Sequence, residues 1–316
     1  MNIVRFDSAR DLDRLDSFLR ERYHEEGTPS PWLPQRLHDL IYRTGELEAE
    51  TGAVRSGDYI FLFEEDGRID GCVLPDGENI YFSFRPERED LFPTMLEYSE
   101  NNCLPLFRRD ENGAVKFWVA VSSRQTSAAD TLLRRGYEKT DWQEDWNCIF
   151  PQNTKALPEV PEGFRLLYGE EYPDEENKWS ALRLCFHPEW ESPDYRCGMR
   201  SYQERKRSCL YPDSFECLTV DTGAQERNDV CSYCFVYVDR QSNTAMIEPA
   251  GTREKYRRRG LGRAMILGAV NRCREQGMEK CYVDSFGWRK DFYASAGFEV
   301  EESIYFWNKM IYPDSV

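Results

Sequence analysis

Apolar positions along the first half of the chain recur with two periods, and each change of period marks an element. Alternation or a short apolar run indicates a strand, whereas apolar residues three and four positions apart indicate a helix. Ser8 precedes a stretch of helical spacing and is expected to cap it. The predicted strands are 2–7, 79–84, 115–121 and 145–150, with a hairpin at 59–75 turning at Asp66-Gly67, and the predicted helices are a long one from Ser8, 35–44, 91–102 and 127–136.

Residues 151–163 carry three prolines and no apolar period, so we interpret them as a linker. After them the same order of elements returns, β-α-α-β-β-β-α-β-α-β, which suggests an old duplication. We therefore expect two α/β domains, 1–150 and 164–316. The predicted strands of the second are 164–169, 215–221, 232–240, 244–249, 280–286 and 298–311, and its predicted helices are 177–186, 201–209, 261–273 and 289–297.

Composition supports two domains and restricts the partners. A chain of 316 residues is too long for one ordinary core, and 40% hydrophobic content allows each half a core of its own. The net charge of -16 repels nucleic acid and anionic lipid, so neither is an expected partner. No apolar run reaches the roughly 18 positions of a membrane helix, and the N-terminus lacks the apolar stretch of a signal peptide.

The 11 cysteines are scattered and odd in number, which favours buried free thiols in a reducing cytoplasm over a disulfide framework. Cys231 and Cys234 form a lone C-x-x-C. Positions i and i+3 of a strand face opposite ways, so this pair does not suit a metal. We expect a cytoplasmic protein without a metal.

Residues 256–265, YRRRGLGRAM, place two glycines between a strand and an apolar helix. Gly260 and Gly262 can adopt positive φ and have no β-carbon to block a ligand, so the amides of the turn can point at one spot. Such a concavity binds anions, and the helix dipole adds to the attraction. Fixed positive charge comes from Arg257, Arg258, Arg259 and Arg263. The alternative is an ordinary helix start with a solvated arginine face.

The motif Arg257-x-x-Gly260-x-Gly262 resembles motif A of the general amine N-acetyltransferase (GNAT) superfamily, and Tyr293-x-x-x-Gly297-Phe298 resembles its motif B. The resemblance implies two tandem GNAT-like domains, each a mixed, mostly antiparallel sheet flanked by helices. It also implies that the fourth and fifth strands of the second domain splay apart to hold acetyl-CoA. The implied contacts are Ala250, Gly251 and Thr252 for pantetheine, and Arg257, Arg258, Arg259, Gly260, Leu261, Gly262 and Arg263 for pyrophosphate.

Two residues are candidates for proton transfer. Glu248 lies on the strand that leads to the glycine turn, beside apolar neighbours, and suits a general base. Alternatively, it is an ordinary carboxylate at the solvent-exposed end of a strand. Tyr293 suits a general acid for the leaving thiolate, or is an ordinary core aromatic. Three histidines and no nucleophile turn favour direct transfer without an acyl-enzyme. Gly287 stands where many relatives have an asparagine, which removes a polar contact near the thioester.

At the equivalent place the first half reads Arg85-Pro86-Glu87 and has no glycine in the turn. Its acidic side chains, Glu87, Glu89 and Asp90, would repel phosphates. We expect a degenerate copy that does not bind CoA. The sequence therefore predicts an N-acetyltransferase that moves the acetyl group of acetyl-CoA to a primary amine of a small molecule or peptide, as a monomer or homodimer. The alternative is a non-catalytic acyl-CoA-binding sensor or assembly protein.

Overall fold

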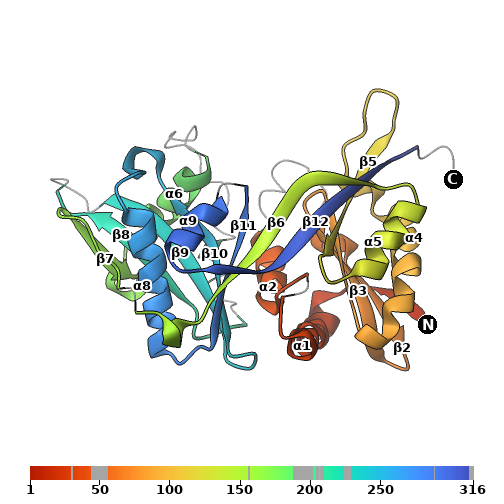
Figure 1. Ribbon diagram of the computed structural model, residues 1–316, viewed down its shortest axis with the longest axis horizontal. Helices are drawn as coiled ribbons and strands as arrows, with labels where there is room; N and C mark the ends of the chain where they lie inside the picture. Colours follow the sequence, from red (N-terminus) through yellow and green to blue (C-terminus); the bar gives the residue numbers. More distant parts are fainter. Residues whose placement is uncertain are drawn as a thin grey trace. The chain divides into compact units, whose positions relative to one another are not determined.

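A computed structural model describes residues 1–29, 31–43, 56–155, 157–187, 202–203, 206, 210–223, 229–287 and 289–312. Contacts group the chain into two compact units. The first unit is Met1–Asp145 with Glu302–Val316, and the second is Trp146–Glu301. Each unit is a mixed sheet flanked by helices, which confirms the predicted fold class (Figure 1).

The first unit contains a sheet in the order β1-β2-β3-β4-β5-β12-β6. Its elements are β1 (Asn2–Arg5), α1 (Ser8–Glu26), α2 (Pro34–Arg43), η1 (Ser56–Tyr59), β2 (Phe61–Glu65), β3 (Arg68–Asp76), β4 (Asn79–Phe84), η2 (Pro86–Leu91), α4 (Phe92–Asn102), η3 (Leu104–Leu106), β5 (Val115–Ser122), α5 (Thr126–Arg134), β6 (Glu138–Ile149) and β12 (Glu299–Ile311). The β4–β5 pair is parallel, whereas β1–β2, β2–β3, β3–β4 and β5–β12 are antiparallel.

The second unit contains the end of β6, from Trp146, and a sheet in the order β6-β11-β10-β9-β8-β7. Its further elements are η4 (Pro151–Asn153), β7 (Phe164–Tyr168), η5 (Gly169–Glu171), α6 (Glu175–Phe186), β8 (Phe215–Asp221), β9 (Asp229–Asp239), β10 (Thr244–Thr252), η6 (Glu254–Tyr256), α8 (Leu261–Glu275), β11 (Lys280–Phe286) and α9 (Arg289–Ser295). Here β10–β11 is parallel, and β7–β8, β8–β9 and β9–β10 are antiparallel.

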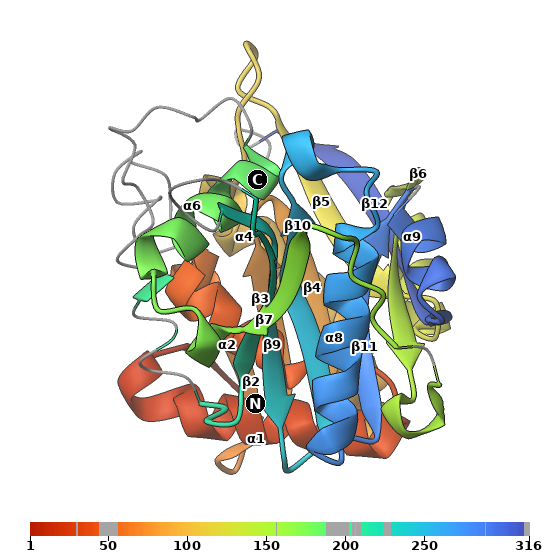
Figure 2. The ribbon, with the colours of Figure 1, turned by 90° about the vertical axis from the view of Figure 1, so that its left-hand side faces the viewer.

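Helices cover both faces of the sheet in the second unit (Figures 1 and 2). On one face, apolar side chains of α8 and α9 pack with alternate residues of the strands, such as Cys217, Val236 and Ala245. On the opposite face, Glu216 of β8 is bonded to Lys178 of α6. This alternation follows from the period of two along a strand, and it separates an apolar face from a more polar one.

Most predicted elements are present within a few residues of their predicted bounds. The hairpin of β2 and β3 turns at Asp66 and Gly67, which have φ of 50° and 81°, as a two-residue turn of this kind requires. The helix predicted at 201–209 lies for the most part outside the described residues.

Two details of the sequence prediction were wrong. The cap of α1 is Asp7, whose Oδ1 accepts a hydrogen bond of 2.9 Å from the amide of Ala9, so Ser8 is already helical. Strand β6 begins at Glu138 and not at residue 145. Its first half is largely exposed and polar, so it carries no apolar signal, although Thr140 Oγ1 donates to the carbonyl of Phe306 at 2.9 Å.

The last strand of each repeat is divided between the two units. Most of β12, from Glu302 on, belongs to the first unit, and β6 from Trp146 to Ile149 belongs to the second. In the first unit, β12 pairs with β5 from Ile304 to Ile311. In the second unit, Asn147 at the end of β6 donates to the carbonyl of Val283 on β11 at 3.3 Å and to Ser285 Oγ at 2.7 Å. The compact units therefore differ from the predicted division at residues 150 and 164, because contacts across a sheet do not follow chain order.

Strands β10 and β11 splay apart, as predicted. Their pairing covers only Thr244↔Lys280, Ala245↔Cys281 and Met246↔Tyr282, although both strands continue beyond it. The register of β10 against β9 also shifts between Ile247 and Ala250. Pro249 lies in this interval and cannot donate a ladder hydrogen bond, which accounts for the irregularity. We call the separation of the two strands beyond Met246 and Tyr282 the splay. It opens at the carboxyl ends of these two adjacent parallel strands.

Candidate functional site

The turn before α8 leaves a row of backbone amides without acceptors inside the helix. Gly260 is the N-cap residue, with φ of 81°, and no side chain caps the helix. The first intrahelical hydrogen bond is donated by Ala264 to the carbonyl of Gly260 at 3.0 Å. The amides of Leu261, Gly262 and Arg263 therefore lie in the first turn, at the positive end of a helix of 15 residues. This geometry can hold an anion.

Two glycines allow close approach at this place. A β-carbon on Gly262 would lie 2.8 Å from Thr252 Oγ1, so its absence keeps the start of α8 against the end of β10. A β-carbon on Gly251 would lie 2.5 Å from Cys185 Cβ, so Gly251 also serves the packing of β10 against α6. Ala250, Gly251 and Thr252 are all half-buried, in line with a strand end that borders an opening.

The four arginines of the turn divide into two kinds. Arg257 donates to the carbonyls of Thr252 at 3.0 Å and Cys185 at 3.1 Å, and Arg263 donates to the carbonyl of Ser295 at 3.1 Å. These two guanidinium groups hold backbone segments together. Arg258 and Arg259 are exposed, and Arg259 lies 5.8 Å from the ring centroid of Tyr256. Arg258 and Arg259 therefore supply accessible positive charge at the turn.

Two carboxylates occupy matching positions beyond the last pair of the splayed strands. Met246 of β10 pairs with Tyr282 of β11, and Glu248 and Asp284 each lie two residues further along. Both are half-buried. Because side chains alternate along a strand, they share the face of Met246 and Tyr282, opposite the face covered by α8. Sequence analysis identified Glu248 but missed Asp284, since only the register shows that the two correspond.

Tyr293 approaches the splay from the other face. It lies on α9, is 7% exposed and packs against Phe292 and Phe298, with ring centroids 5.1 and 5.9 Å away. Burial raises the pKa of the Tyr293 phenol well above its ordinary value, and the carboxylates of Asp284 and Glu248 raise it further. The phenol therefore stays protonated throughout the neutral range.

The first unit has a similar splay, but a side chain bridges it. Strands β4 and β5 pair only from Asn79↔Trp118 to Tyr81↔Ala120. Beyond that point, Gln125 Nε2 donates to the carbonyl of Phe82 at 3.2 Å, and Gln125 Oε1 accepts from the amide of Ser122 at 3.0 Å. One glutamine thus joins both strands where the second unit is open. No feature of the sequence alone indicates this contact.

The turn after β4 also differs from the glycine turn. The 3₁₀ segment η2 follows Arg85, whose Nε donates to the carbonyl of Ile69 at 3.0 Å. Arg88 is bonded to the carboxylates of Asp70 and Glu65. These arginines are engaged with acidic partners of their own unit.

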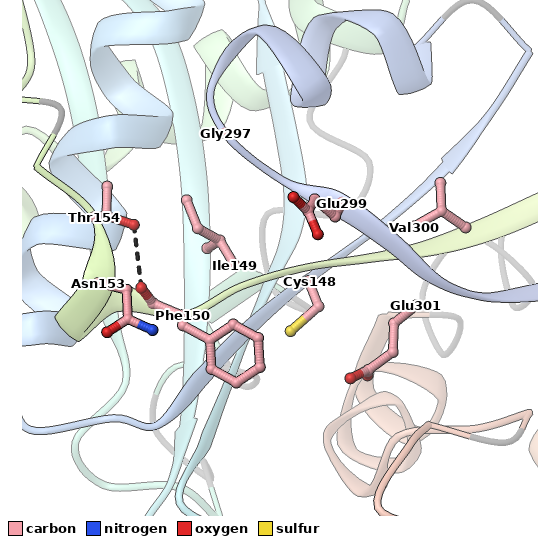
Figure 3. A pocket seen from close by; sticks show the side chains of 9 residues that line it. All are labelled: Cys148, Ile149, Phe150, Asn153, Thr154, Gly297, Glu299, Val300 and Glu301. Atoms are coloured by element: carbon pink, nitrogen blue, oxygen red, sulfur yellow. Dashed lines mark hydrogen bonds between the residues drawn. The ribbon is translucent and has the colours of Figure 1, made fainter.

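A cavity of about 320 Å³ lies elsewhere in the second unit (Figure 3). Its lining residues are Cys148, Ile149, Phe150, Asn153, Thr154, Gly297, Glu299, Val300 and Glu301. Glu301 accepts hydrogen bonds from Lys280 at 2.7 Å and Tyr282 at 2.6 Å. Because Lys280 is the first residue of β11, this cavity lies at the end of the strand opposite to the splay. Neither Glu248 nor Tyr293 is among its lining residues.

Among the residues that the structure describes, no helix is long and apolar enough to cross a membrane. Within the same residues, no group of three His, Cys, Asp or Glu side chains is placed to hold a metal ion.

Comparison with known protein families matches residues 179–298 to the acetyltransferase (GNAT) family. This segment of the chain is a GNAT domain. It contains the splay, the glycine turn, Glu248 and Tyr293. A search of curated protein sequences finds no match.

Solved structures extend the GNAT fold to the whole chain. A GCN5-related N-acetyltransferase from Sphaerobacter thermophilus is 17% identical, with a TM-score of 0.64, over 99% of this chain and 96% of its own. A tandem GNAT protein from the clavulanic acid biosynthesis pathway is 13% identical, with a TM-score of 0.56, over 98% of both chains. A GNAT-family acetyltransferase from Colwellia psychrerythraea is 14% identical, with a TM-score of 0.55, over 98% and 99%. These likenesses show a tandem GNAT fold.

Proposed function

We propose that this protein is an acyl-CoA-dependent N-acetyltransferase whose second unit carries the reaction. The observation that carries the proposal is the glycine turn at the start of α8, placed directly beside the end of a splayed strand. The amides of Leu261, Gly262 and Arg263, with Arg258 and Arg259, would hold the pyrophosphate. The backbone of Ala250, Gly251 and Thr252 would hold the pantetheine. Acetyl-CoA supplies the activated acetyl group when bound.

The two residues proposed for proton transfer lie on opposite faces of the splayed strands. Glu248, on the face opposite α8, would accept a proton from the acceptor ammonium, either directly or through water. The neutral nitrogen then attacks the thioester carbon, so that a C–N bond forms as the C–S bond breaks. The second proton that the nitrogen loses on becoming an amide passes to solvent or returns Tyr293 to its protonated form. Tyr293, on the α9 face, would give its proton to the departing sulfur, because its raised pKa keeps it protonated. Each proton transfer of this kind contributes about 100-fold or more to the rate.

The second candidate is a protein that binds acyl-CoA without turnover. Gly287 favours it, because this position has φ of 58° with open space around it, and a glycine there offers no side chain of its own to the region near the thioester. Glu248 and Asp284 at the splay, with protonated Tyr293 opposite, favour the enzyme.

For the first unit, we propose a copy that does not bind CoA. The Gln125 bridge between β4 and β5 supports this, since it takes the backbone groups that a ligand in the splay would need. The acceptor would be an amine of a small molecule or peptide. The described free cysteines are all buried, which fits a reducing cytoplasm as the proposed location.

The test is a screen of amine acceptors for release of free thiol from acetyl-CoA. An active acceptor is then used with Glu248→Gln, which should keep its affinity for acetyl-CoA and lose turnover about 100-fold. The acidic limb of the wild-type pH–rate profile should disappear in this variant. Glu254→Gln, an exposed glutamate of η6, is the matched control and should keep its rate. Tight acetyl-CoA binding with no thiol release for any amine would instead support the sensor.

A further inference from the structure

The carboxyl end of α6 lies directly against the segment of β10 that would hold pantetheine. A β-carbon on Gly251 would meet Cβ and Sγ of Cys185 at 2.5 and 3.2 Å, and Cε2 of Phe186 at 3.6 Å. Cys185 and Phe186 are the last two residues of α6. The absence of a side chain at 251 therefore allows the helix end to approach the strand this closely.

An arginine of the glycine turn fixes this helix end. The last carbonyls of a helix have no donor within the helix and form its negative end, which a cation stabilises. Arg257 Nη2 donates to the carbonyl of Cys185 at 3.1 Å, and Arg257 Nε donates to the carbonyl of Thr252 at 3.0 Å. One guanidinium thus joins the end of α6 to the end of β10, beside the turn that starts α8.

These hydrogen bonds separate Arg257 from the other arginines of the turn. Both leave from one edge of the planar guanidinium, and such an edge is also what holds two oxygens of a phosphate. The positive charge of Arg257 is directed at the carboxyl end of α6. Arg258 and Arg259 are exposed at the turn, and the proposed function assigns the phosphates to them and to the backbone amides.

Phe186 is the side chain whose place this arrangement determines. Phe186 is 49% exposed, and the edge of its ring reaches the position that a side chain on Gly251 would fill. The ring therefore offers apolar area beside the backbone of 250–252. The pantetheine arm carries methylene and methyl groups, and covering apolar area on both partners stabilises a complex.

We infer that Arg257 is a positioning residue for acetyl-CoA: it holds the end of α6 against β10, so that Phe186 forms an apolar wall along the pantetheine arm, and it binds no phosphate itself. This inference rests on the proposed function, because it assumes that the backbone of 250–252 holds pantetheine. It assigns the first arginine of the motif a role in binding the apolar part of the ligand.

The experiment compares two ligands by calorimetry: acetyl-CoA, and 3′-phosphoadenosine 5′-diphosphate, which is its nucleotide part without pantetheine. Phe186→Ala and Arg257→Gln should each weaken acetyl-CoA about 10-fold and leave the affinity for the nucleotide within about 2-fold. Arg257→Lys, which can still donate to a carbonyl, should lose less. Arg258→Gln should weaken both ligands by the same factor, because both carry the phosphates.

A double variant tests whether Arg257 acts through Phe186. Because the wall is already absent in Phe186→Ala, adding Arg257→Gln should weaken acetyl-CoA little further. The control is Arg240→Gln, since Arg240 also donates to a backbone carbonyl at a helix end, that of Gln276 after α8, and should keep both affinities. Circular dichroism establishes that the Arg257 variants are folded, and the exposed position of Phe186 keeps its variant informative if they are not.

An Arg257→Gln variant that loses both ligands by the same factor would overturn the inference and leave the proposed function intact, because Arg257 would then contact the phosphates. Wild-type affinity of Phe186→Ala for acetyl-CoA would also overturn it, as would losses that add fully in the double variant. A wild-type protein that binds neither ligand would overturn the proposed function and this inference together.

Discussion

A β-carbon added to Gly262 would lie 2.8 Å from the Oγ1 atom of Thr252. Real β-carbons do not approach a heavy atom this closely, so a side chain at 262 requires either the Thr252 hydroxyl or the start of α8 to shift. The relationship joins two groups of residues that the proposed function needs together, the amides of the α8 turn and the backbone of β10 at 250–252. It makes position 262 the most direct test of the turn.

We predict that Gly262→Glu abolishes acetyl-CoA binding, since it adds both bulk and negative charge where phosphates would lie. Isothermal titration calorimetry measures the binding, and circular dichroism establishes that the variant is folded. Gly262→Ala separates the two effects and should weaken binding less. A folded Gly262→Glu variant with normal acetyl-CoA affinity would show that the phosphates bind elsewhere.

One acetyl-CoA should bind per chain. The turn that follows β4 has no glycine, and Gln125 of the first unit bridges Phe82 and Ser122 across the separated strands β4 and β5. Calorimetric titration gives the stoichiometry directly. Gln125→Gly should not raise it, because the turn at η2 would still begin with a proline, which has no amide hydrogen, and would keep its acidic residues Glu87 and Glu89. Two equivalent sites per chain would contradict the proposal for the first unit.

Tyr293→Phe should lower kcat by about 100-fold with little change in acetyl-CoA affinity. Burial, with the Asp284 and Glu248 carboxylates, raises the pKa of this phenol. The wild type should therefore not lose its general acid as the pH rises through about 10, the ordinary value for tyrosine. The pH–rate profile of Tyr293→Phe should keep the acidic limb that Glu248→Gln loses.

Tyr168→Phe is the matched control for that experiment. Tyr168 is a partly buried tyrosine of the same unit whose hydroxyl donates to the carbonyl of Gly268 at 3.2 Å, away from the splay. It should keep most of the wild-type kcat. If Tyr293→Phe turns over as fast as this control, then water or another group protonates the leaving sulfur.

Glu216 should be a large contributor to stability. It is 4% exposed and accepts hydrogen bonds from Lys178 at 2.8 Å, Lys206 at 2.9 Å, Tyr202 at 2.6 Å and Tyr233 at 2.8 Å. Glu216→Gln leaves two ammonium groups without this partner, so the free energy of unfolding at pH 7 should fall by about 3 kcal/mol. Denaturant unfolding measures it. Glu170→Gln removes an exposed ion pair with Arg272 and should cost less than about 1 kcal/mol.

The effect of Glu216 should depend on pH in a defined direction. Although burial opposes ionisation, the ammonium groups of Lys206 and Lys178 hold the pKa of Glu216 below its ordinary value. Its stabilisation is therefore present above the unfolded pKa of about 4.3 and is lost as the pH falls through the lower folded value. The difference between wild type and Glu216→Gln should shrink as the solution is acidified below about pH 4. A difference that is constant from pH 7 to pH 3 would assign the loss to packing.

Sequence patterns predicted the order of elements because most helices and strands bury one apolar face. This burial leaves a regular spacing of apolar residues in the sequence. Sequence patterns also identified the turn at Gly260, because two glycines between a strand and an apolar helix indicate a backbone turn with positive φ. Strand β6 shows the limit: its first half is held by backbone pairing with little apolar burial, so no pattern marks its start at Glu138. The register between strands that are far apart in the sequence leaves no pattern either. The sequence therefore could not show that Asp284 lies level with Glu248, or that Gln125 donates to the carbonyl of Phe82.

Strand β6, from the first half of the sequence, pairs with β11, and strand β12, from the second half, pairs with β5. This pairing limits which parts of the chain can be lost in evolution. Residues 164–316 alone would encode a sheet in which β11 lacks its β6 neighbour, and residues 1–150 alone would leave β5 without β12. An uncovered strand edge invites aggregation. If the first half binds no ligand, as we propose, it would still be inherited, because deleting it would also remove the strand that pairs with β11.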